Sequence, residues 1–148
     1  MMEQKKKVLF VCSANTCRSA MAEAILREYG GGRYEAASAG LFAHGGEPMM
    51  PECAKALSKL FPRPVSYTSH FSRRLTADML ADSDIVCAVS EGYASLLRQF
   101  YPEYADKIVF FPEGISDLSR LSGEALVSGA RSLRDQIFRM FLCDGKQN

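Results

Sequence analysis

Five residues separate a cysteine from an arginine in the short polar segment that follows the chain's first apolar run. The segment reads CSANTCRS, from Cys12 to Ser19, and a stretch with helical spacing begins directly after it. A tight turn entering a helix gathers backbone N–H groups around one point, and the helix N-terminus adds about half a positive charge. A thiol at the base of such a turn ionises readily and becomes a nucleophile. The segment therefore predicts an anion-binding loop that carries its own nucleophile.

Two further side chains in this segment suit the same chemistry. The planar guanidinium of Arg18 can bind two phosphate oxygens at once, and the Ser19 hydroxyl can donate a hydrogen bond to a thiolate at Cys12. A cysteine taken alone is more often a buried apolar residue than a nucleophile. The Cys-x5-Arg-Ser spacing between a strand and a helix favours the catalytic interpretation.

The composition is typical of one globular domain spanning residues 1–148 and excludes several other classes of protein. Hydrophobic residues make up 47% of the chain, charged residues 24%, and the formal net charge is +1. Lys5 to Lys7 form the sole basic cluster, which argues against nucleic acid as a partner. No apolar run approaches the ~20 residues that cross a bilayer. We therefore expect a cytoplasmic protein without a membrane partner.

The cysteines do not form a pattern typical of secreted or zinc-binding proteins. Their number is odd and their spacing irregular, which argues against a secreted disulfide framework. Neither His44 nor His70 lies near another candidate metal ligand in the sequence. We therefore expect no metal and no cofactor. The five cysteines are Cys12, Cys17, Cys53, Cys87 and Cys143.

Apolar periodicity predicts strands that alternate with helices along the chain. Short buried-type runs predict strands at Lys7–Cys12, Arg33–Ala37, Asp84–Val89 and Lys107–Phe111. Helical spacing occurs in Met21–Tyr29, from Pro51 to before Pro62, and in Thr76–Ala81, Tyr93–Phe100 and Leu126–Phe141. This alternation predicts an α/β fold with layers of helices around a parallel sheet. Ligands bind beyond the carboxyl ends of such strands, so Cys12 and the loop after Phe111 should converge.

The loop resembles the active-site loop of the low-molecular-weight protein tyrosine phosphatases, whose pattern is V-C-x-G-N-x-C-R-S-P-M-A-E. Three later segments, ASAGL, HFSRRLT and DIVCAVSEGY, are similar to family segments in the same order. The resemblance implies a three-layer, flavodoxin-like fold with a central four-stranded parallel sheet. The matching loop residues are Val11, Cys12, Asn15, Cys17, Arg18, Ser19, Met21, Ala22 and Glu23.

The resemblance also implies a two-step phosphatase mechanism acting on phosphorylated proteins. Cys12 would attack phosphorus and form a phosphocysteine, while Arg18 and the loop amides hold the equatorial oxygens. Asp117 would protonate the leaving group and then activate water. An aspartate in a turn is also a common capping residue, and this alternative stays open for Asp117. The implied phosphate-binding residues are Ser13, Ala14, Asn15, Thr16, Cys17 and Ser19.

Residues outside the nucleophile and arginine match family positions that support the loop. The resemblance implies that Asn15, Ser38 and His70 brace it by hydrogen bonds, although His70 alone would be read as a surface histidine. Cys17 matches the second loop cysteine of the family, which can form a reversible disulfide with the nucleophile. Inert packing is the alternative role for Cys17.

The chain departs from the family pattern at three places. Ala14 stands where the family usually has glycine, and a positive φ there would cost the methyl group about 1 kcal/mol. Ala20 replaces the usual proline at the helix start. Leu118 and Ser119 replace a proline and an aromatic residue after the acid, which removes a ring from the rim of the cleft.

The substrate and two alternative functions stay open at this stage. Thr16 occupies a position where many tyrosine-directed members carry a bulky aliphatic residue and arginine-phosphatase-like members carry threonine, so phosphotyrosine and phosphoarginine are both candidates. Arsenate reduction would need neighbouring resolving cysteines, and Cys87 has no other cysteine within eight residues. A catalytically impaired phosphate-binding module is suggested by Ala14 and by the altered loop around Asp117.

Overall fold

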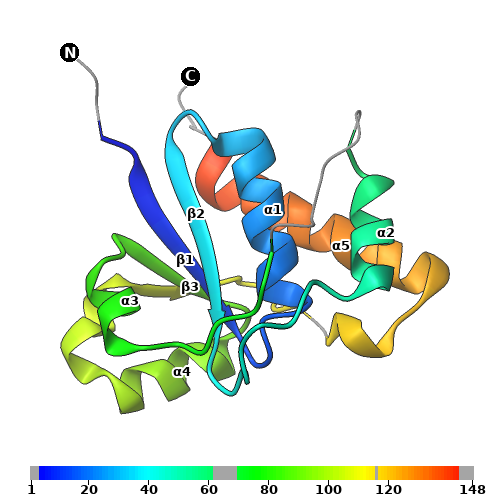
Figure 1. Cartoon of the computed structure of the whole chain (residues 1–148). Helices are drawn as coiled ribbons and strands as arrows, with labels where there is room; N and C mark the ends of the chain where they lie inside the picture. The colour runs from blue at the N-terminus through cyan, green and yellow to red at the C-terminus, as the bar shows by residue number, and fades with distance from the viewer. Residues whose placement is uncertain (1–3, 62–69, 116, 144–148) are drawn as a thin grey trace.

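The computed structural model describes residues 4–61, 70–115 and 117–143, and its centre is a four-stranded parallel sheet (Figure 1). The strand order β2-β1-β3-β4 places the first strand between two others, as in flavodoxin-like folds. All neighbouring strands are parallel, which confirms the predicted sheet. The strands are β1 (Lys6–Cys12), β2 (Tyr34–Gly40), β3 (Ile85–Ala88) and β4 (Ile108–Phe110).

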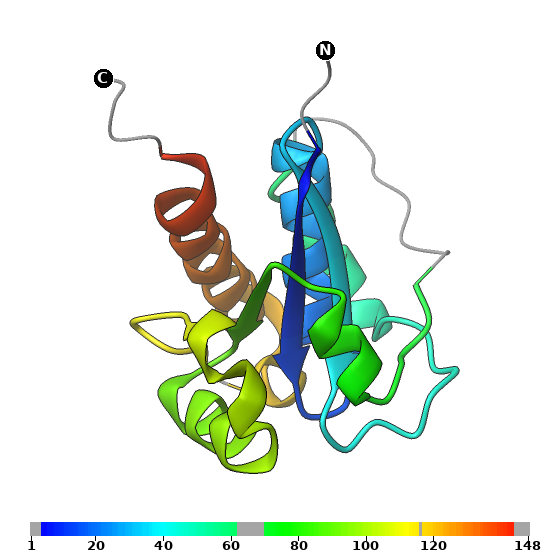
Figure 2. The ribbon, with the colours of Figure 1, turned by 90° about the vertical axis from the view of Figure 1, so that its left-hand side faces the viewer.

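Helices cover both faces of the sheet and give the three expected layers (Figures 1 and 2). On one face lie α1 (Arg18–Gly30), α2 (Pro51–Ser58) and α5 (Gly123–Ile137). These three helices share one buried hydrophobic cluster with β1. On the other face lie α3 (Ala77–Ala81) and α4 (Glu91–Phe100), in a second buried cluster. Short 3₁₀ helices span Pro102–Lys107 and Leu118–Arg120, and a π-helical turn spans Phe138–Leu142.

The central strand β1 is apolar on both faces, which fixes the position of its carboxyl end. Val8 and Phe10 point into the cluster with α1 and α5, and Leu9 and Val11 point into the cluster with α3 and α4. This alternation is the period-2 pattern of a strand covered on both sides. All four residues are at most 1% exposed. Cys12, the last residue of β1, therefore stands on a rigid support.

Several element boundaries differ from the predicted ones, among them the ends of α1 and β2. The helix α1 includes Gly30, although the glycine run predicted an earlier end; a Cβ at Gly30 would lie 2.8 Å from Leu26 Cδ1, so the packing there is tight. The strand β2 continues to Gly40 because its last three residues pair with the end of β1. The helix α2 ends at Ser58, earlier than the predicted stop at Pro62, so Leu60 lies in the turn that follows; Pro62 itself lies outside the described residues.

Within the part of the chain that the structure describes, no helix is both long and apolar enough to cross a membrane. The same residues contain no group of three or more His, Cys, Asp or Glu side chains placed to hold a metal ion.

Candidate active site

The loop between β1 and α1, residues Ser13–Cys17, turns its carbonyl groups outward. Phe42 N–H donates to the Ser13 carbonyl at 3.0 Å, and Met50 N–H donates to the Thr16 carbonyl at 2.9 Å. Among the described residues, none accepts a hydrogen bond from a backbone N–H of this loop. Backbone N–H groups are rarely left without an acceptor, and several in one turn form an anion-binding concavity. The loop therefore has the hydrogen-bonding pattern of an oxyanion-binding site.

Cys12 and Ser19 meet at the base of this loop. Cys12 is 3% exposed, and its Sγ lies 2.9 Å from Ser19 Oγ in the first turn of α1. The side-chain amide of Asn15 donates to Ser19 Oγ at 2.8 Å. Since that oxygen accepts from Asn15, its own proton can point to the sulfur of Cys12 at 2.9 Å or to the Ala39 carbonyl at 3.5 Å. The structure thus places the Ser19 hydroxyl in contact with the Cys12 sulfur.

Asn15, and not Ala14, carries the left-handed backbone of the loop. Among the described residues, Asn15 is the one non-glycine residue with positive φ, at 62°. Asparagine tolerates this conformation better than most residues. The conditional cost considered for the Ala14 methyl therefore does not arise. Asn15 is fully buried and its Oδ1 accepts from Arg73 N–H at 2.9 Å, which holds the turn in place.

A buried hydrogen-bond network holds the side-chain amide and the backbone carbonyl of Asn15. Its Nδ2 donates to Ser38 Oγ at 2.9 Å, and that hydroxyl donates to Glu23 Oε1 at 2.5 Å. His70 Nε2 donates to the Asn15 carbonyl at 2.8 Å, and its Nδ1 lies 4.0 Å from Glu23 Oε1. The structure thus places Ser38 and His70 behind the loop, as the resemblance implied. It also shows that Glu23 joins this network, a role that the sequence analysis did not predict although Glu23 matches the loop motif.

The end of β2 approaches the loop so closely that only glycine fits there. A Cβ at Gly40 would lie 3.0 Å from the carbonyl carbon of Ala14 and closer still to the carbonyl oxygen of Ser13. Leu41 N–H donates to the Cys12 carbonyl at 2.9 Å in the same region. The glycine of the ASAGL segment therefore allows close backbone contact with the end of β1 and the loop after it.

The guanidinium of Arg18 lies at the open side of the loop. Its Nη1 donates to the carbonyl of Ile115 at 3.3 Å, in the segment after β4. Its Cζ is 5.5 Å from the ring centroid of Tyr93. No carboxylate in the described part of the chain forms an ion pair with Arg18. The segments after β1 and β4 therefore converge at the carboxyl edge of the sheet, as expected, and the segment after β3 joins them through Tyr93.

Asp117 caps the short helix Leu118–Arg120 and also interacts electrostatically with Arg18. Its Oδ1 accepts from the Ser119 hydroxyl at 2.5 Å and from Ser119 N–H at 3.1 Å. The Ser119 hydroxyl bond is the main cause of a lowered pKa for Asp117; partial burial opposes it, and the Ser119 N–H, Arg18 and Arg120 lower the pKa further. The capping role left open for Asp117 is thus present, together with proximity to the guanidinium.

Neither of the two residues directly after Asp117 places an aromatic ring at the cleft. Leu118 is 1% exposed, and a Cβ at Gly129 of α5 would collide with its side chain. Ser119 instead binds Asp117. An exposed ring is found on another side, at Phe42, whose backbone is hydrogen-bonded to Ser13.

Cys17 forms a disulfide with Cys53 of α2 and is not paired with Cys12. The resemblance implied that Cys17 can pair reversibly with the nucleophile. In this structure Cys12 is a free thiol, and the disulfide joins the end of the loop to α2. The Met50–Thr16 hydrogen bond joins the same two segments. The disulfide therefore reinforces a contact that the backbone already makes.

We expect the Cys53→Ser substitution to lower the free energy of unfolding by about 2–4 kcal/mol under non-reducing conditions, since a cross-link restricts the unfolded chain. Urea denaturation measured with and without dithiothreitol checks this. Cys143→Ser, which removes an exposed free thiol, is the control and should change little. Equal stability of wild type and Cys53→Ser in oxidising buffer would contradict the expectation.

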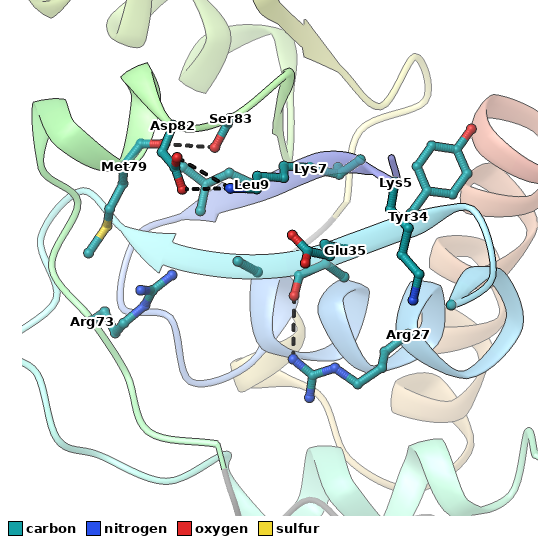
Figure 3. A pocket seen from close by; sticks show the side chains of 14 residues that line it. Lys5, Lys7, Leu9, Arg27, Tyr34, Glu35, Arg73, Met79, Asp82 and Ser83 are labelled. Atoms are coloured by element: carbon teal, nitrogen blue, oxygen red, sulfur yellow. Dashed lines mark hydrogen bonds and ion pairs between the residues drawn. The ribbon is translucent and has the colours of Figure 1, made fainter. Parts of the chain in front are cut away.

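A hollow at the edge of the sheet is separate from this site (Figure 3). It has a volume of about 480 Å³ and lies beside the amino-terminal halves of β1 and β2. Its charged side chains are largely occupied: Lys7 pairs with Asp82, and Arg27 pairs with Glu23 and reaches the carbonyl of Ala36. Cys12 does not line it. We assign the hollow no part in the chemistry.

Comparison with known proteins gives matches over most of the chain. Residues 7–123 match the family model described as low molecular weight phosphotyrosine protein phosphatase. The protein-arginine-phosphatase of Bacillus subtilis (strain 168) is 30% identical over 112 residues, which cover 74% of this chain and 72% of that protein. Arsenate reductase 1 of Bacillus cereus is 32% identical over 107 residues, covering 72% and 75%.

A solved structure agrees over a still longer part of the chain. The crystal structure of the low molecular weight protein tyrosine phosphatase from T. tengcongensis superposes with a TM-score of 0.82 at 34% identity. The superposition covers 90% of this chain and 95% of that one.

Proposed function

Because the chain belongs to the low molecular weight phosphotyrosine protein phosphatase family, we propose that it removes phosphate from protein side chains with Cys12 as the nucleophile. One observation carries the proposal. The Cys12 sulfur lies 2.9 Å from Ser19 Oγ, at the base of a loop whose N–H groups have no acceptor among the described residues. A phosphate group above the sulfur would satisfy those donors and meet the guanidinium of Arg18.

In the first step the Cys12 thiolate attacks phosphorus, so that a sulfur–phosphorus bond forms as the bond to the leaving atom breaks. Protonated Asp117 gives its proton to that leaving atom. The loop N–H groups and Arg18 bind the equatorial oxygens, most tightly in the transition state. In the second step ionised Asp117 takes a proton from water, the water oxygen attacks phosphorus, and inorganic phosphate leaves as Cys12 is restored as a thiolate.

Phosphotyrosine and phosphoarginine are the substrates that this site suits. The side chain of Thr16 is partly exposed in the loop, and threonine leaves more room there than isoleucine. The relative that acts on phosphoarginine and the solved tyrosine phosphatase are both similar to this chain. The exposed ring of Phe42 beside the loop is placed to contact a protein substrate.

The substitution Thr16→Ile tests how the loop selects its leaving group. We expect it to shift the ratio of kcat/KM for phosphoarginine over phosphotyrosine peptides downward by about tenfold, the effect of one or two methylenes in a packed pocket. Turnover of p-nitrophenyl phosphate in the same preparations reports whether the chemical step is intact. An unchanged ratio would remove position 16 as a determinant of substrate choice.

The contacts of Asp117 predict a pH effect with a definite sign. Only protonated Asp117 can act as the acid, and its lowered pKa restricts that form to acidic pH. Ser119→Ala removes the largest cause of the lowering, so the pKa of Asp117 should rise towards its usual value. The alkaline limb of the kcat/KM profile should then move to higher pH. Ser122→Ala, an exposed serine in the following turn, is the control, and a shift to lower pH would contradict the assignment.

Two other functions are less well supported. Arsenate reductases are among the relatives, but Cys87 is fully buried in β3 and burial raises the pKa of its thiol, which disfavours a resolving thiolate there. Thioredoxin-coupled arsenate turnover lost in Cys87→Ala would reverse this ranking. A binding module without catalysis was suggested partly by Ala14, whose backbone is not in the left-handed region. Phosphopeptide binding without release of phosphate at any pH would favour that module.

A further inference from the structure

Tyr93 lies against the guanidinium of Arg18, although it belongs to a different part of the sequence. It is in the first turn of α4, which begins just beyond the carboxyl end of β3 and is capped by Ser90. Ser90 Oγ accepts from Tyr93 N–H at 3.4 Å, which orients this turn. The 5.5 Å between Arg18 Cζ and the ring centroid falls within the range of about 6 Å over which a guanidinium is attracted to an aromatic ring.

The ring of Tyr93 is held by the core on both sides of the sheet. It is partly buried and packs against both hydrophobic clusters, the one with α1 and α5 and the one with α3 and α4. A tyrosine side chain has few rotatable bonds, so packing at this junction fixes its ring plane. Arg18 has a longer, more flexible side chain and therefore gains its orientation from the ring.

The other contacts of Arg18 leave its charge available to an anion. Its hydrogen-bond acceptor is the carbonyl of Ile115, a neutral group, and no carboxylate forms an ion pair with it in the segments 4–61, 70–115 and 117–143. A carboxylate partner would occupy the N–H edge of the guanidinium and compete with phosphate. A ring contacts the guanidinium face and leaves N–H groups free for phosphate oxygens.

We propose that Tyr93 is a positioning residue that holds the Arg18 guanidinium ready for the phosphate oxygens. This inference rests on the proposed phosphatase function. An arginine that is already oriented loses less side-chain freedom when the oxyanion binds. Its contacts strengthen as charge gathers on the equatorial oxygens, so the benefit is largest in the transition state. Loss of the ring should therefore weaken vanadate inhibition and lower kcat/KM together.

The test compares Tyr93→Leu with Tyr93→Phe in kcat/KM for p-nitrophenyl phosphate and in the inhibition or dissociation constant for vanadate. Tyr93→Leu, which keeps apolar bulk but removes the ring, should lower kcat/KM and weaken vanadate binding by about tenfold each. Tyr93→Phe keeps the ring and should stay within about twofold of wild type. Tyr104→Leu removes a ring that lies over Lys107, away from Arg18, and should leave both values unchanged. Thermal denaturation confirms that each variant is folded.

Vanadate binding in the Arg18→Lys background separates positioning from a general structural effect, because lysine lacks the planar group that stacks. There, adding Tyr93→Leu should change the dissociation constant by less than about twofold. The same tenfold loss in that background would overturn the proposal. So would full vanadate affinity in Tyr93→Leu, or a defect in Tyr93→Phe equal to that of Tyr93→Leu. If wild type bound vanadate but hydrolysed no phosphorylated substrate, the proposed function would fail, and the vanadate comparison would still decide the role of Tyr93.

Discussion

The Cys12→Ser variant is expected to lose turnover by about 10⁴-fold or more on any phosphorylated substrate. The sulfur of Cys12 lies at the base of the loop, 2.9 Å from Ser19 Oγ, and is the attacking atom in the proposed mechanism. A serine hydroxyl in the same position is held by the same contacts, yet it stays protonated at neutral pH and attacks phosphorus poorly. Release of inorganic phosphate, measured with p-nitrophenyl phosphate and phosphopeptides, checks the loss.

The same variant separates the covalent step from binding. Loop N–H groups and Arg18 are unchanged in Cys12→Ser, so phosphopeptides should still bind. Acid quenching during turnover of a labelled substrate should trap phosphate on Cys12 in wild type and nothing in the variant. Substantial turnover by Cys12→Ser, or label on a different residue of wild type, would contradict the assignment of the nucleophile.

The fold was largely predictable because each strand carries its own local pattern. The run from Val8 to Val11 is apolar without interruption, and the structure covers both of its faces. The end of β2 was predicted three residues short, since Ser38, Ala39 and Gly40 have little intrinsic preference for strands. Their extended form depends on pairing with β1 and on the bonds between Gly40 and the Arg73 region.

From residue types and spacing alone, the site was predictable only where it is continuous in sequence, whereas Ser38, His70 and Asp117 were expected from the family resemblance. Cys12, Arg18 and Ser19 fall within one turn, so their spacing alone indicates a phosphate loop. Cys53 of α2 and Tyr93 of α4 contact that loop because their helices pack against it. Nothing in the local sequence of either helix indicates this contact. The aromatic residue missing after Asp117 could be read from the sequence, but the exposed ring of Phe42 across the loop could not.

The Asp117→Asn variant should lower kcat/KM by roughly 10²–10⁴ for substrates with poor leaving groups, the range usual for a lost general acid. Asparagine keeps an oxygen that can accept from Ser119 N–H, so the capped turn should persist while the transferable proton is gone. For p-nitrophenyl phosphate, whose leaving group needs little protonation, the loss should be smaller.

This dependence on the leaving group distinguishes a lost acid from a damaged loop, because misplacement of Arg18 would slow all substrates alike. Phenyl phosphate and p-nitrophenyl phosphate give the comparison, with Asp106→Asn, an exposed aspartate before β4, as the control that should retain full activity. The two residues directly after Asp117 are not aromatic, and its carboxylate is held by Ser119 and Arg120 instead. Equal losses on both substrates would show that Asp117 only caps the turn and that it is not the general acid.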